Sequence, residues 1–489
     1  MNARASAMGD KSKRHSPRRW LRPMTTLTLS TAVLVLSIGA TEHAFSAAPR
    51  KAPNIVLILA DDLGYGDLGC YGQKLVPTPN LDRMAAEGTR FTHAYAGSSC
   101  CGPSRCSLMT GLHGGHMTVR DNGGSLSEKD TTVAAVLNRA GYATGAFGKW
   151  HLGGAGRPGA PNAQGFETFF GIDPADGGSS THFLPTLYRN GKPETVAANR
   201  DGRQGAFGDD LFLDEALAFI RKQHRQPFFV YLAFRVPHKA LEAPPEDLQR
   251  FAGQFAEQSF PGDGQVGPCP QPKAARAAMI AHLDRKLPEV LQTLRELELD
   301  RQTLVIFTSD NGPATAGGSD PAFFGSSGGL RGTKFTFYEG GIREPFLAWW
   351  PGVIPAGRTC DLPVAFCDLL PTFAQLAGTE CPPTDGLSIA PALRGDMQAQ
   401  PRHEYLYWER AGQQAVRTGS WKAIHHVSRG TLELYDLATD PSEQNNVAAQ
   451  QPGAVARIRG ILQEAHTDNP EYPLAGKAGK ARKSASTAR

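Results

Sequence analysis

Three continuous apolar segments constrain the fold more than any other feature of this sequence. Asn54–Ala60, Pro227–Phe234 and Leu304–Thr308 are rich in β-branched or aromatic residues. Such runs are typical of strands buried on both faces of a parallel sheet. The helical patterns between these segments are Leu81–Glu87, Thr131–Ala140 and Ala274–Leu297. We expect the last helix to kink or restart at Pro288. This order predicts an α/β fold: a large mixed, mostly parallel, doubly wound sheet flanked by helices.

Polar residues follow each of the three apolar segments. Asp61-Asp62 comes after the first, Pro237-His238 after the second and Asp310-Asn311 after the third. In open α/β sheets, ligands bind beyond the carboxyl ends of the strands. The sequence therefore predicts a single polar site at that edge.

The pattern of expected secondary structure changes after residue 395. Short strand-like segments alternate with turns: Glu404–Trp408, Gln414–Arg417, Trp421–His425 and Leu432–Leu437. A helical pattern follows at Ala454–His466. We interpret residues 50–395 as a catalytic domain, 396–474 as a small antiparallel sheet with one helix, and 475–489 as a disordered basic tail.

The first 48 residues have the pattern of an export signal. Six Lys and Arg residues between Lys11 and Arg22 precede a short apolar stretch, Thr25–Ala40, and small residues at Ser46–Ala48. This pattern predicts a signal peptide over 1–48 and a periplasmic or secreted protein, with no permanent membrane span. An uncleaved anchor is the alternative. Arg18-Arg19 partially matches a twin-arginine signal.

The charge distribution argues against a nucleic-acid partner. The chain has a net charge of +4, but residues 1–48 and 476–489 each carry +5, which leaves −6 for the sequence between them. A mildly acidic body does not provide a basic binding face. Export would permit disulfides among the eight cysteines, whose pairing the sequence leaves open.

The segment from Cys101 to Gly111 carries the most specific motif. It reads Cys-Gly-Pro-Ser-Arg105, followed by five residues and Gly. It resembles the signature of the type I, formylglycine-dependent sulfatases, which are similar to arylsulfatase A and belong to the alkaline phosphatase superfamily. Further segments resemble this family in the same order: Ala60–Asp67, Gly148–Gly153, Thr308–Gly312, Leu330–Lys334, Tyr338–Pro345, Asp368–Thr372 and Leu434–Pro441. A structural cysteine in a proline-containing turn is the alternative for Cys101 alone.

The resemblance implies that a maturation enzyme oxidises Cys101 to formylglycine (3-oxoalanine). The hydrated aldehyde attacks sulfur and, unlike serine, expels sulfate afterwards. By the same resemblance, the metal ligands are Asp61, Asp62, Asp310 and Asn311, together with the modified Cys101. Hard oxygen ligands suit Ca²⁺, suit Mg²⁺ less well and do not suit zinc.

The remaining catalytic residues also follow from the resemblance. Lys149 and Lys334 would bind the sulfate oxygens, on which charge develops in the transition state. Arg105 would fix the diol, because it lies one helical turn after Cys101 if Pro103 opens a helix. His151 would act as the base and His238 as the acid, since imidazole titrates near working pH. For any single Lys or His, a surface charge or a structural role is the alternative.

Several points remain open in the sequence. Ser179, Ser180, Thr181 and His182 are candidates to complete the sulfate site, and the sequence favours none of them; His113 and His116 are candidates to line the pocket, with no role assigned to them. The loops Asp173–Lys192 and Gly253–Pro272 would select the substrate, a sulfated small molecule or glycan, with sulfated carbohydrates favoured over aryl sulfates. The alternatives are a phosphate or phosphonate ester hydrolase on the same scaffold and a non-catalytic protein that binds sulfated glycans.

Overall fold

The structure, a computed structural model, describes residues 52–173 and 180–474. The predictions for residues 1–48, 475–489 and Ser179 lie outside these ranges. Within them, no helix combines the length and the hydrophobicity that a membrane crossing requires. All eight cysteines fall in the described part, and each has a free thiol.

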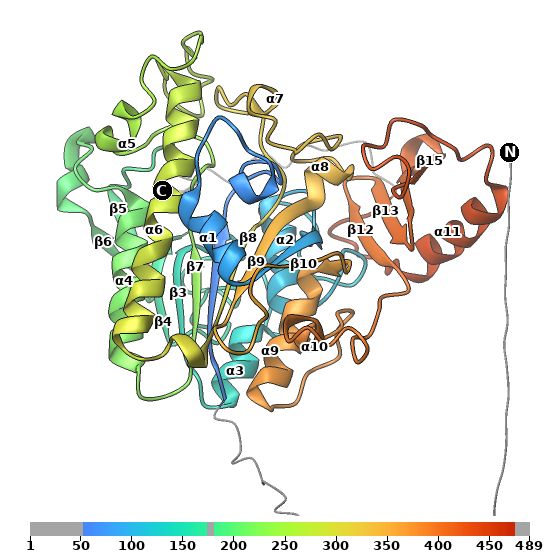
Figure 1. Cartoon of the computed structure of the whole chain (residues 1–489), viewed down its shortest axis with the longest axis horizontal. Helices are drawn as coiled ribbons and strands as arrows, with labels where there is room; N and C mark the ends of the chain where they lie inside the picture. The colour runs from blue at the N-terminus through green and yellow to red at the C-terminus, as the bar shows by residue number, and fades with distance from the viewer. Residues whose placement is uncertain (1–51, 174–179, 475–489) are drawn as a thin grey trace, which may run out of the picture. The chain divides into compact units, whose positions relative to one another are not determined.

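A large sheet forms the centre of the fold (Figure 1). Its strands are β1 (Asn54–Ala60), β2 (Thr89–Tyr95), β3 (Ala143–Lys149), β4 (Thr168–Ile172), β5 (Thr186–Arg189), β6 (Lys192–Thr195), β7 (Phe228–Ala233), β8 (Thr303–Ser309), β9 (Arg343–Trp349), β10 (Arg358–Cys360) and β11 (Val364–Ala365). Ten of them follow the order β10-β2-β9-β8-β1-β7-β3-β4-β5-β6, and β11 pairs with β2. The strands β8, β1, β7, β3 and β4 are mutually parallel, whereas β9, β5 and β6 pair antiparallel. The predicted mixed, mostly parallel sheet is confirmed.

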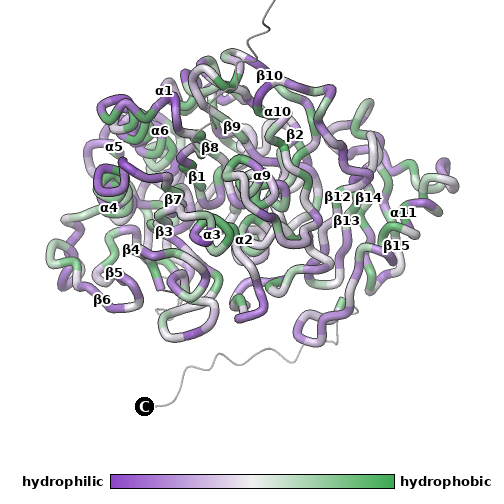
Figure 2. The backbone as a smooth tube through the Cα atoms, turned by 90° about the horizontal axis from the view of Figure 1, so that it is seen from below, coloured by the Kyte–Doolittle hydropathy of each residue, from purple (hydrophilic) through white to green (hydrophobic). Residues whose placement is uncertain are grey.

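Helices cover both faces of this sheet. They are α1 (Pro79–Glu87), α2 (Cys101–Thr110), α3 (Val133–Arg139), α4 (Gly208–Gln223), α5 (Pro245–Gln249), α6 (Pro272–Glu296), α7 (Pro321–Phe324), α8 (Glu339–Ile342), α9 (Leu369–Ala377) and α10 (Ala390–Leu393). In β1, Val56 and Ile58 pack with α1, α4 and α6, whereas Ile55, Leu57 and Leu59 pack with α2, α3 and α9. Both faces of β1 are therefore buried, which explains its continuous apolar sequence. In Figure 2, α4 and α6 alternate between polar and apolar residues, as helices with one face on a sheet should.

The predicted helix over Ala274–Leu297 is confirmed, but it does not restart at Pro288. One helix, α6, runs from Pro272 to Glu296 with Pro288 inside it. Leu287, Val290 and Leu291 are buried on the two sides of the proline. Their packing offsets the hydrogen bond that proline cannot donate.

A second, antiparallel sheet follows the main one in sequence. It contains β12 (Leu406–Arg410), β13 (Gln413–Thr418), β14 (Trp421–His426) and β15 (Thr431–Asp436), with α11 (Pro452–Glu464) packed against it. The predicted C-terminal sheet with one helix is thus confirmed. Trp408 joins it to the segment directly after β2, because its indole Nε1 donates to the Ala96 carbonyl at 2.8 Å. The boundary at residue 395 stays a prediction.

Candidate active site

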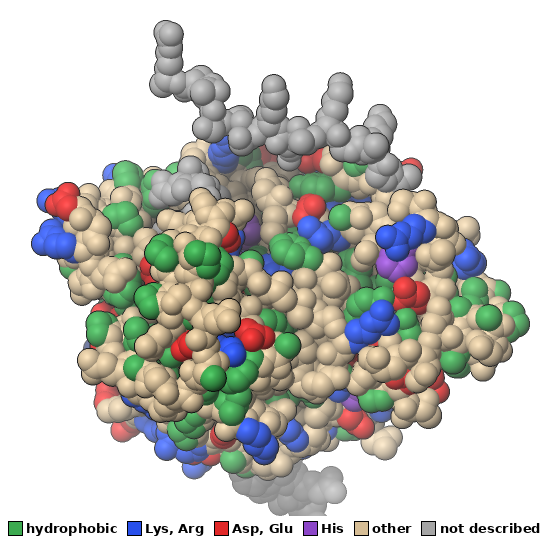
Figure 3. Space-filling model, turned by 90° about the horizontal axis from the view of Figure 1, so that it is seen from above, with side chains coloured by type: hydrophobic (Ala, Val, Ile, Leu, Met, Phe, Trp, Pro, Cys, Tyr) green, Lys and Arg blue, Asp and Glu red, His purple; other side chains and the backbone are tan. Residues whose placement is uncertain are grey.

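Four buried oxygen-bearing side chains meet where β1 and β8 end. The two strands are parallel neighbours with Ala60 opposite Ser309, so Asp61-Asp62 and Asp310-Asn311 leave the sheet side by side. The Asp62 N–H donates to Asp310 Oδ1 at 3.2 Å, and Asn311 Nδ2 donates to Asp62 Oδ1 at 2.8 Å. Asp62 has a φ of +67°, in the left-handed region that Asp tolerates better than most residues. Figure 3 looks onto this edge, where acidic, basic and histidine side chains are intermixed.

The oxygen atoms of this group fit a hard divalent cation. Asp62 Oδ2 and Asn311 Oδ1 are buried and have no hydrogen-bond partner among the described residues. Such groups are costly unless something else satisfies them. Ligand atoms of Asp61, Asp62, Cys101 and His238 also lie within 4.8 Å of one another. A cation at this point would satisfy both unpartnered oxygens.

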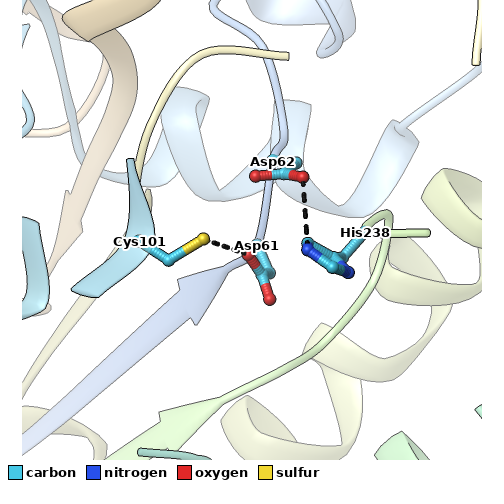
Figure 4. Close-up of side chains that lie close together, drawn as sticks. All are labelled: Asp61, Asp62, Cys101 and His238. Atoms are coloured by element: carbon cyan, nitrogen blue, oxygen red, sulfur yellow. Dashed lines mark hydrogen bonds and ion pairs between the residues drawn. The ribbon is translucent and has the colours of Figure 1, made fainter. Parts of the chain in front are cut away.

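Cys101 begins α2 and points into this group (Figure 4). Its Sγ lies 3.5 Å from Asp61 Oδ1 and 3.1 Å from Lys334 Nζ. The side chain is buried, and burial raises the pKa of the thiol despite the charges of Lys149 and Lys334. An unmodified Cys101 is therefore a neutral thiol, which is a poor nucleophile.

Three cations bind the carboxylates. Arg105, one turn along α2, donates to Asp310 Oδ2 at 2.8 and 3.0 Å. Lys149, the last residue of β3, pairs with Asp61, and Lys334 Nζ lies 2.6 Å from Asp62 Oδ1. Burial opposes ionisation, but Lys149 and the other cations hold the pKa of Asp61 well below its usual value, and Lys334 likewise lowers that of Asp62. Three cations therefore face three carboxyl groups, and the net charge of these six side chains is close to zero.

The two predicted histidines face the same group. Burial, followed by the charges of Lys149 and Arg105, lowers the pKa of His151 well below its usual value, and its Nδ1 has no hydrogen-bond partner among the described residues. His238 donates from Nδ1 to the Lys239 carbonyl at 2.6 Å, so its Nε2, 3.7 Å from Asp62 Oδ2, is free of a proton when the ring is neutral. Burial lowers the pKa of His238 to about 3. Both rings are neutral in the free protein.

Comparison with known proteins places this site in a family. The family model described as "Sulfatase" matches residues 53–379, a stretch that contains every predicted site residue. The chain belongs to the sulfatase family. A second model, "N-sulphoglucosamine sulphohydrolase, C-terminal", matches residues 332–466. The sulfatase is 37% identical to arylsulfatase A of Homo sapiens, over 85% of this chain and 87% of that protein. It is 34% identical to the N-acetylgalactosamine-6-sulfatase of Canis lupus familiaris, over 89% and 82%.

Solved structures agree with this assignment. Ps i-CgsB, in complex with k-i-k-neocarrahexaose, superimposes with a TM-score of 0.71 at 29% identity, covering 87% of this chain and 94% of that one. A Bacteroides thetaiotaomicron protein described for the metabolism of multiple glycosaminoglycans gives 0.71 at 28% identity, over 85% and 99%. The phosphonate monoester hydrolase of Agrobacterium radiobacter gives 0.62 at 22% identity, which shows a common fold only. The sulfatase is an enzyme that hydrolyses sulfate esters.

A cavity of about 900 Å³ opens above Cys101 in the sulfatase. The sequence did not single out several of its lining residues: Asn122, Arg235, Lys239, Thr315, Ala316 and Phe335. The predicted loop Gly253–Pro272 contributes Gln265 and Val266, and Ile172 lies just before the predicted loop Asp173–Lys192. Phe335 follows Lys334 directly, which is the one signal that could have marked it. Lys239 likewise follows His238 directly, and Arg235 lies three residues before it, whereas no motif marks Asn122, Thr315 or Ala316.

Two minor predictions have different outcomes. His113 and His116 do not line the cavity; the prediction was wrong because their turn faces Asp385 instead. His182 is buried, and its Nε2 bonds the His238 carbonyl at 2.9 Å. This contact holds the backbone of the predicted acid. Which residue of 179–182 completes the sulfate site stays a prediction.

Proposed function

We propose that this sulfatase desulfates a carbohydrate, using formylglycine made from Cys101 and a calcium ion held by Asp61, Asp62, Asp310 and Asn311. One observation carries the proposal. Cys101 Sγ lies buried at the start of α2, between Asp61 Oδ1 and Lys334 Nζ. A neutral thiol gains little from this position, whereas an oxygen nucleophile there would lie beside both the proposed metal ligands and the Lys334 ammonium group.

The residues around Cys101 would divide the chemistry among them. The hydrated formylglycine would supply one hydroxyl as the oxygen nucleophile, and loss of the proton from its second hydroxyl would expel sulfate and restore the aldehyde. Lys149 and Lys334 line the cavity, where they would bind the sulfate oxygens and stabilise the charge of the transition state. Arg105 bonds both Asp310 and the Lys149 carbonyl, and so ties the segment after β8 to the end of β3 across the ends of β1 and β7.

The histidines would move the protons. His151 is neutral and has an unpartnered Nδ1, as a general base requires. His238 would protonate the leaving oxygen. The negative charge of a bound sulfate ester acts to raise the pKa of His238 from about 3, whereas the proposed calcium ion acts to lower it.

The chemistry of the donors supports calcium over zinc. All four proposed ligands offer carboxylate or amide oxygens, and Asp62 Oδ2 and Asn311 Oδ1 await a partner. The ion would hold a sulfate oxygen and polarise the S–O bonds. Magnesium demands stricter octahedral geometry and retains more water, which suits this crowded set less well.

The wall of the cavity supports a carbohydrate substrate. Phe335 is 51% exposed at a positive φ of 72°, and the Arg410 guanidinium lies 5.0 Å from its ring. An exposed aromatic ring beside a polar cavity suits an amphipathic ring such as a sugar. Asn122 and Gln265 offer hydrogen bonds on the same lining. Relatives described with neocarrahexaose and glycosaminoglycans point the same way.

The test combines a mass spectrum with a variant pair. The peptide that contains Cys101 should show the mass of formylglycine, and Cys101→Ala should lose turnover of sulfated oligosaccharides while the neighbouring Cys100→Ala keeps it. Cys101→Ser should be inactive or trap a sulfated enzyme. An intact thiol in the active native enzyme would refute the nucleophile. A preference for phosphate or phosphonate esters over sulfates would refute the proposed substrate chemistry.

Maturation and export complete the proposal. A formylglycine-generating enzyme must act on Cys101, and the buried position of this residue implies modification before folding is complete. We base export on residues 1–48, whose pattern is that of a signal peptide.

A further inference from the structure

A second group of side chains of the types that bind metals lies at the far end of α2 from Cys101. The helix ends at Thr110, and His113-Gly-Gly-His116 forms the following turn. Asp385 comes from the segment between α9 and α10, and its N–H donates to the Gly111 carbonyl at 2.9 Å. The Asp385 carboxylate in turn accepts the His113 N–H at 2.9 Å. One backbone bond and one bond from the main chain to the carboxylate thus fix the two segments before any imidazole contact is counted.

Both imidazoles direct Nδ1 at this carboxylate. His116 Nδ1 lies 2.8 Å from Asp385 Oδ1, and His113 Nδ1 lies 3.6 Å from Asp385 Oδ2. The two rings stack with their centroids 4.4 Å apart. One ligand atom from each residue lies within 4.8 Å of the others. These separations bracket the roughly 3.3 Å that ligand atoms adopt around tetrahedral zinc.

His113 Nδ1 is a hydrogen-bond acceptor and carries no proton. The Gly115 N–H donates to His113 Nδ1 at 3.2 Å, so that nitrogen carries a lone pair. The lone pair accepts the Gly115 N–H in a long hydrogen bond, and Asp385 Oδ2 lies 3.6 Å from the same nitrogen. A metal ion would replace the Gly115 N–H at this lone pair and would bind Asp385 Oδ2 as well.

The two glycines hold the turn in place. A Cβ on Gly114 would lie 2.5 Å from the Glu409 backbone nitrogen, and one on Gly115 would lie 1.8 Å from the Ala465 carbonyl oxygen. Only glycine lets the turn pack this closely beneath β12 and the end of α11. The His113 ring also packs 5.1 Å from Tyr407. The ligands are therefore preorganised, as a tight metal site requires.

We propose that His113, His116 and Asp385 bind one zinc ion, separate from the catalytic cation. Two imidazoles and one carboxylate suit a borderline divalent metal such as zinc, whereas calcium prefers oxygen ligands throughout. A cavity of about 10 Å³ borders His113 and Asp385, close to the smallest volume that holds one water as a fourth ligand. The ion would tie the end of α2 to the segment before α10, close to the C-terminal sheet.

Metal content of matched variants tests the site. The full chain is stripped with a chelator, its calcium is restored, and it is dialysed against equal micromolar zinc before elemental analysis. The wild-type chain should retain one more zinc equivalent than His116→Ala or Asp385→Asn. Zinc should also raise the Tm of the wild type but not of these variants. His224→Ala, at the end of α4 and away from both groups, is the matched control and should behave as the wild type.

The comparison remains informative if one variant fails to fold. Asp385→Asn keeps an oxygen for the His113 N–H, and its Tm without zinc reports its folding independently. Equal zinc content in the wild type and both variants would overturn the proposal and leave a simple His116–Asp385 ion pair. Sulfatase activity in calcium should be the same in all of these chains. Failure of the zinc site is thereby distinguished from failure of the proposed catalytic site.

Discussion

Lys422 is a buried cation that joins the C-terminal sheet to α8, the helix that follows the loop carrying Lys334. Its Nζ lies 3.0 Å from Glu339 Oε1 and 3.4 Å from Glu443 Oε1, and all three side chains are fully buried. Glu339 has other partners, since it accepts a hydrogen bond from Tyr95 at 2.7 Å and lies 3.5 Å from Arg343. Lys422→Met keeps the volume of the side chain but removes its charge. Glu443 is then left without a cation.

The magnitude follows from these distances. With an effective dielectric constant of about 20, the attraction is about 5 kcal/mol for each of the two pairs. Methionine also avoids the several kcal/mol that desolvating Lys422 costs, so a net loss of about 3–5 kcal/mol in the free energy of unfolding is expected. Burial already raises the pKa of Glu443 to about 7, and losing Lys422 raises it further. Protonation at low pH neutralises this carboxyl, so the loss in the free energy of unfolding caused by Lys422→Met should be about half as large at pH 5.5 as at pH 8.5.

Urea unfolding followed by tryptophan fluorescence at the two pH values measures both effects. Lys192→Met, on the exposed strand β6, is the control for removing a lysine charge and should change stability by less than about 0.5 kcal/mol. A loss below about 1 kcal/mol at pH 8.5 would refute the reasoning. So would an equal loss at both pH values.

Three further predictions concern other parts of the enzyme. Phe335→Ala should raise KM for a sulfated oligosaccharide about tenfold and leave a small aryl sulfate nearly unchanged in steady-state assays, since only the larger substrate would cover the ring. Asp61→Asn should weaken calcium binding at least about tenfold by calorimetry, because it removes a ligand charge. His282 lies between Asp247 at 2.7 Å and Asp210 at 3.2 Å, and although burial opposes its charge, these carboxylates raise its pKa. His282→Gln should therefore lower the free energy of unfolding by about 1–3 kcal/mol at pH 6. The wild-type contribution is lost as pH rises through the raised pKa, so the two urea curves should converge by pH 9; a constant gap would contradict this.

Much of the candidate site could be predicted because each of its residues lies in a short motif or directly after a predicted strand. Asp61-Asp62 and Asp310-Asn311 directly follow apolar strands, and a parallel sheet brings the ends of such strands to one edge. Arg105 could be placed beside Cys101 because four residues make one helical turn. These inferences need only the periodicity of strands and helices.

The substrate wall could not be predicted in this way. No motif marks Asn122, and although Gln265 lies in the predicted loop Gly253–Pro272 and Phe335 follows Lys334, the sequence does not show that these side chains meet at one cavity. The misplacement of His113 and His116 has the same origin. They follow the signature closely, but they lie at the opposite end of α2 from Cys101. The direction of their turn is set by Asp385, which comes 269 residues after His116.

The sequence by itself determined the α/β architecture, the edge at which the site forms, and the identity of the residues around Cys101. Apolar periodicity and the order of motifs encode these features along the chain. Tertiary structure alone decided the burial of Cys101 between Asp61 and Lys334, the unpartnered oxygens of the metal group and the cavity that Phe335 borders. These features depend on side chains that approach from distant segments, and their charges, protonation and packing are set by neighbours in space.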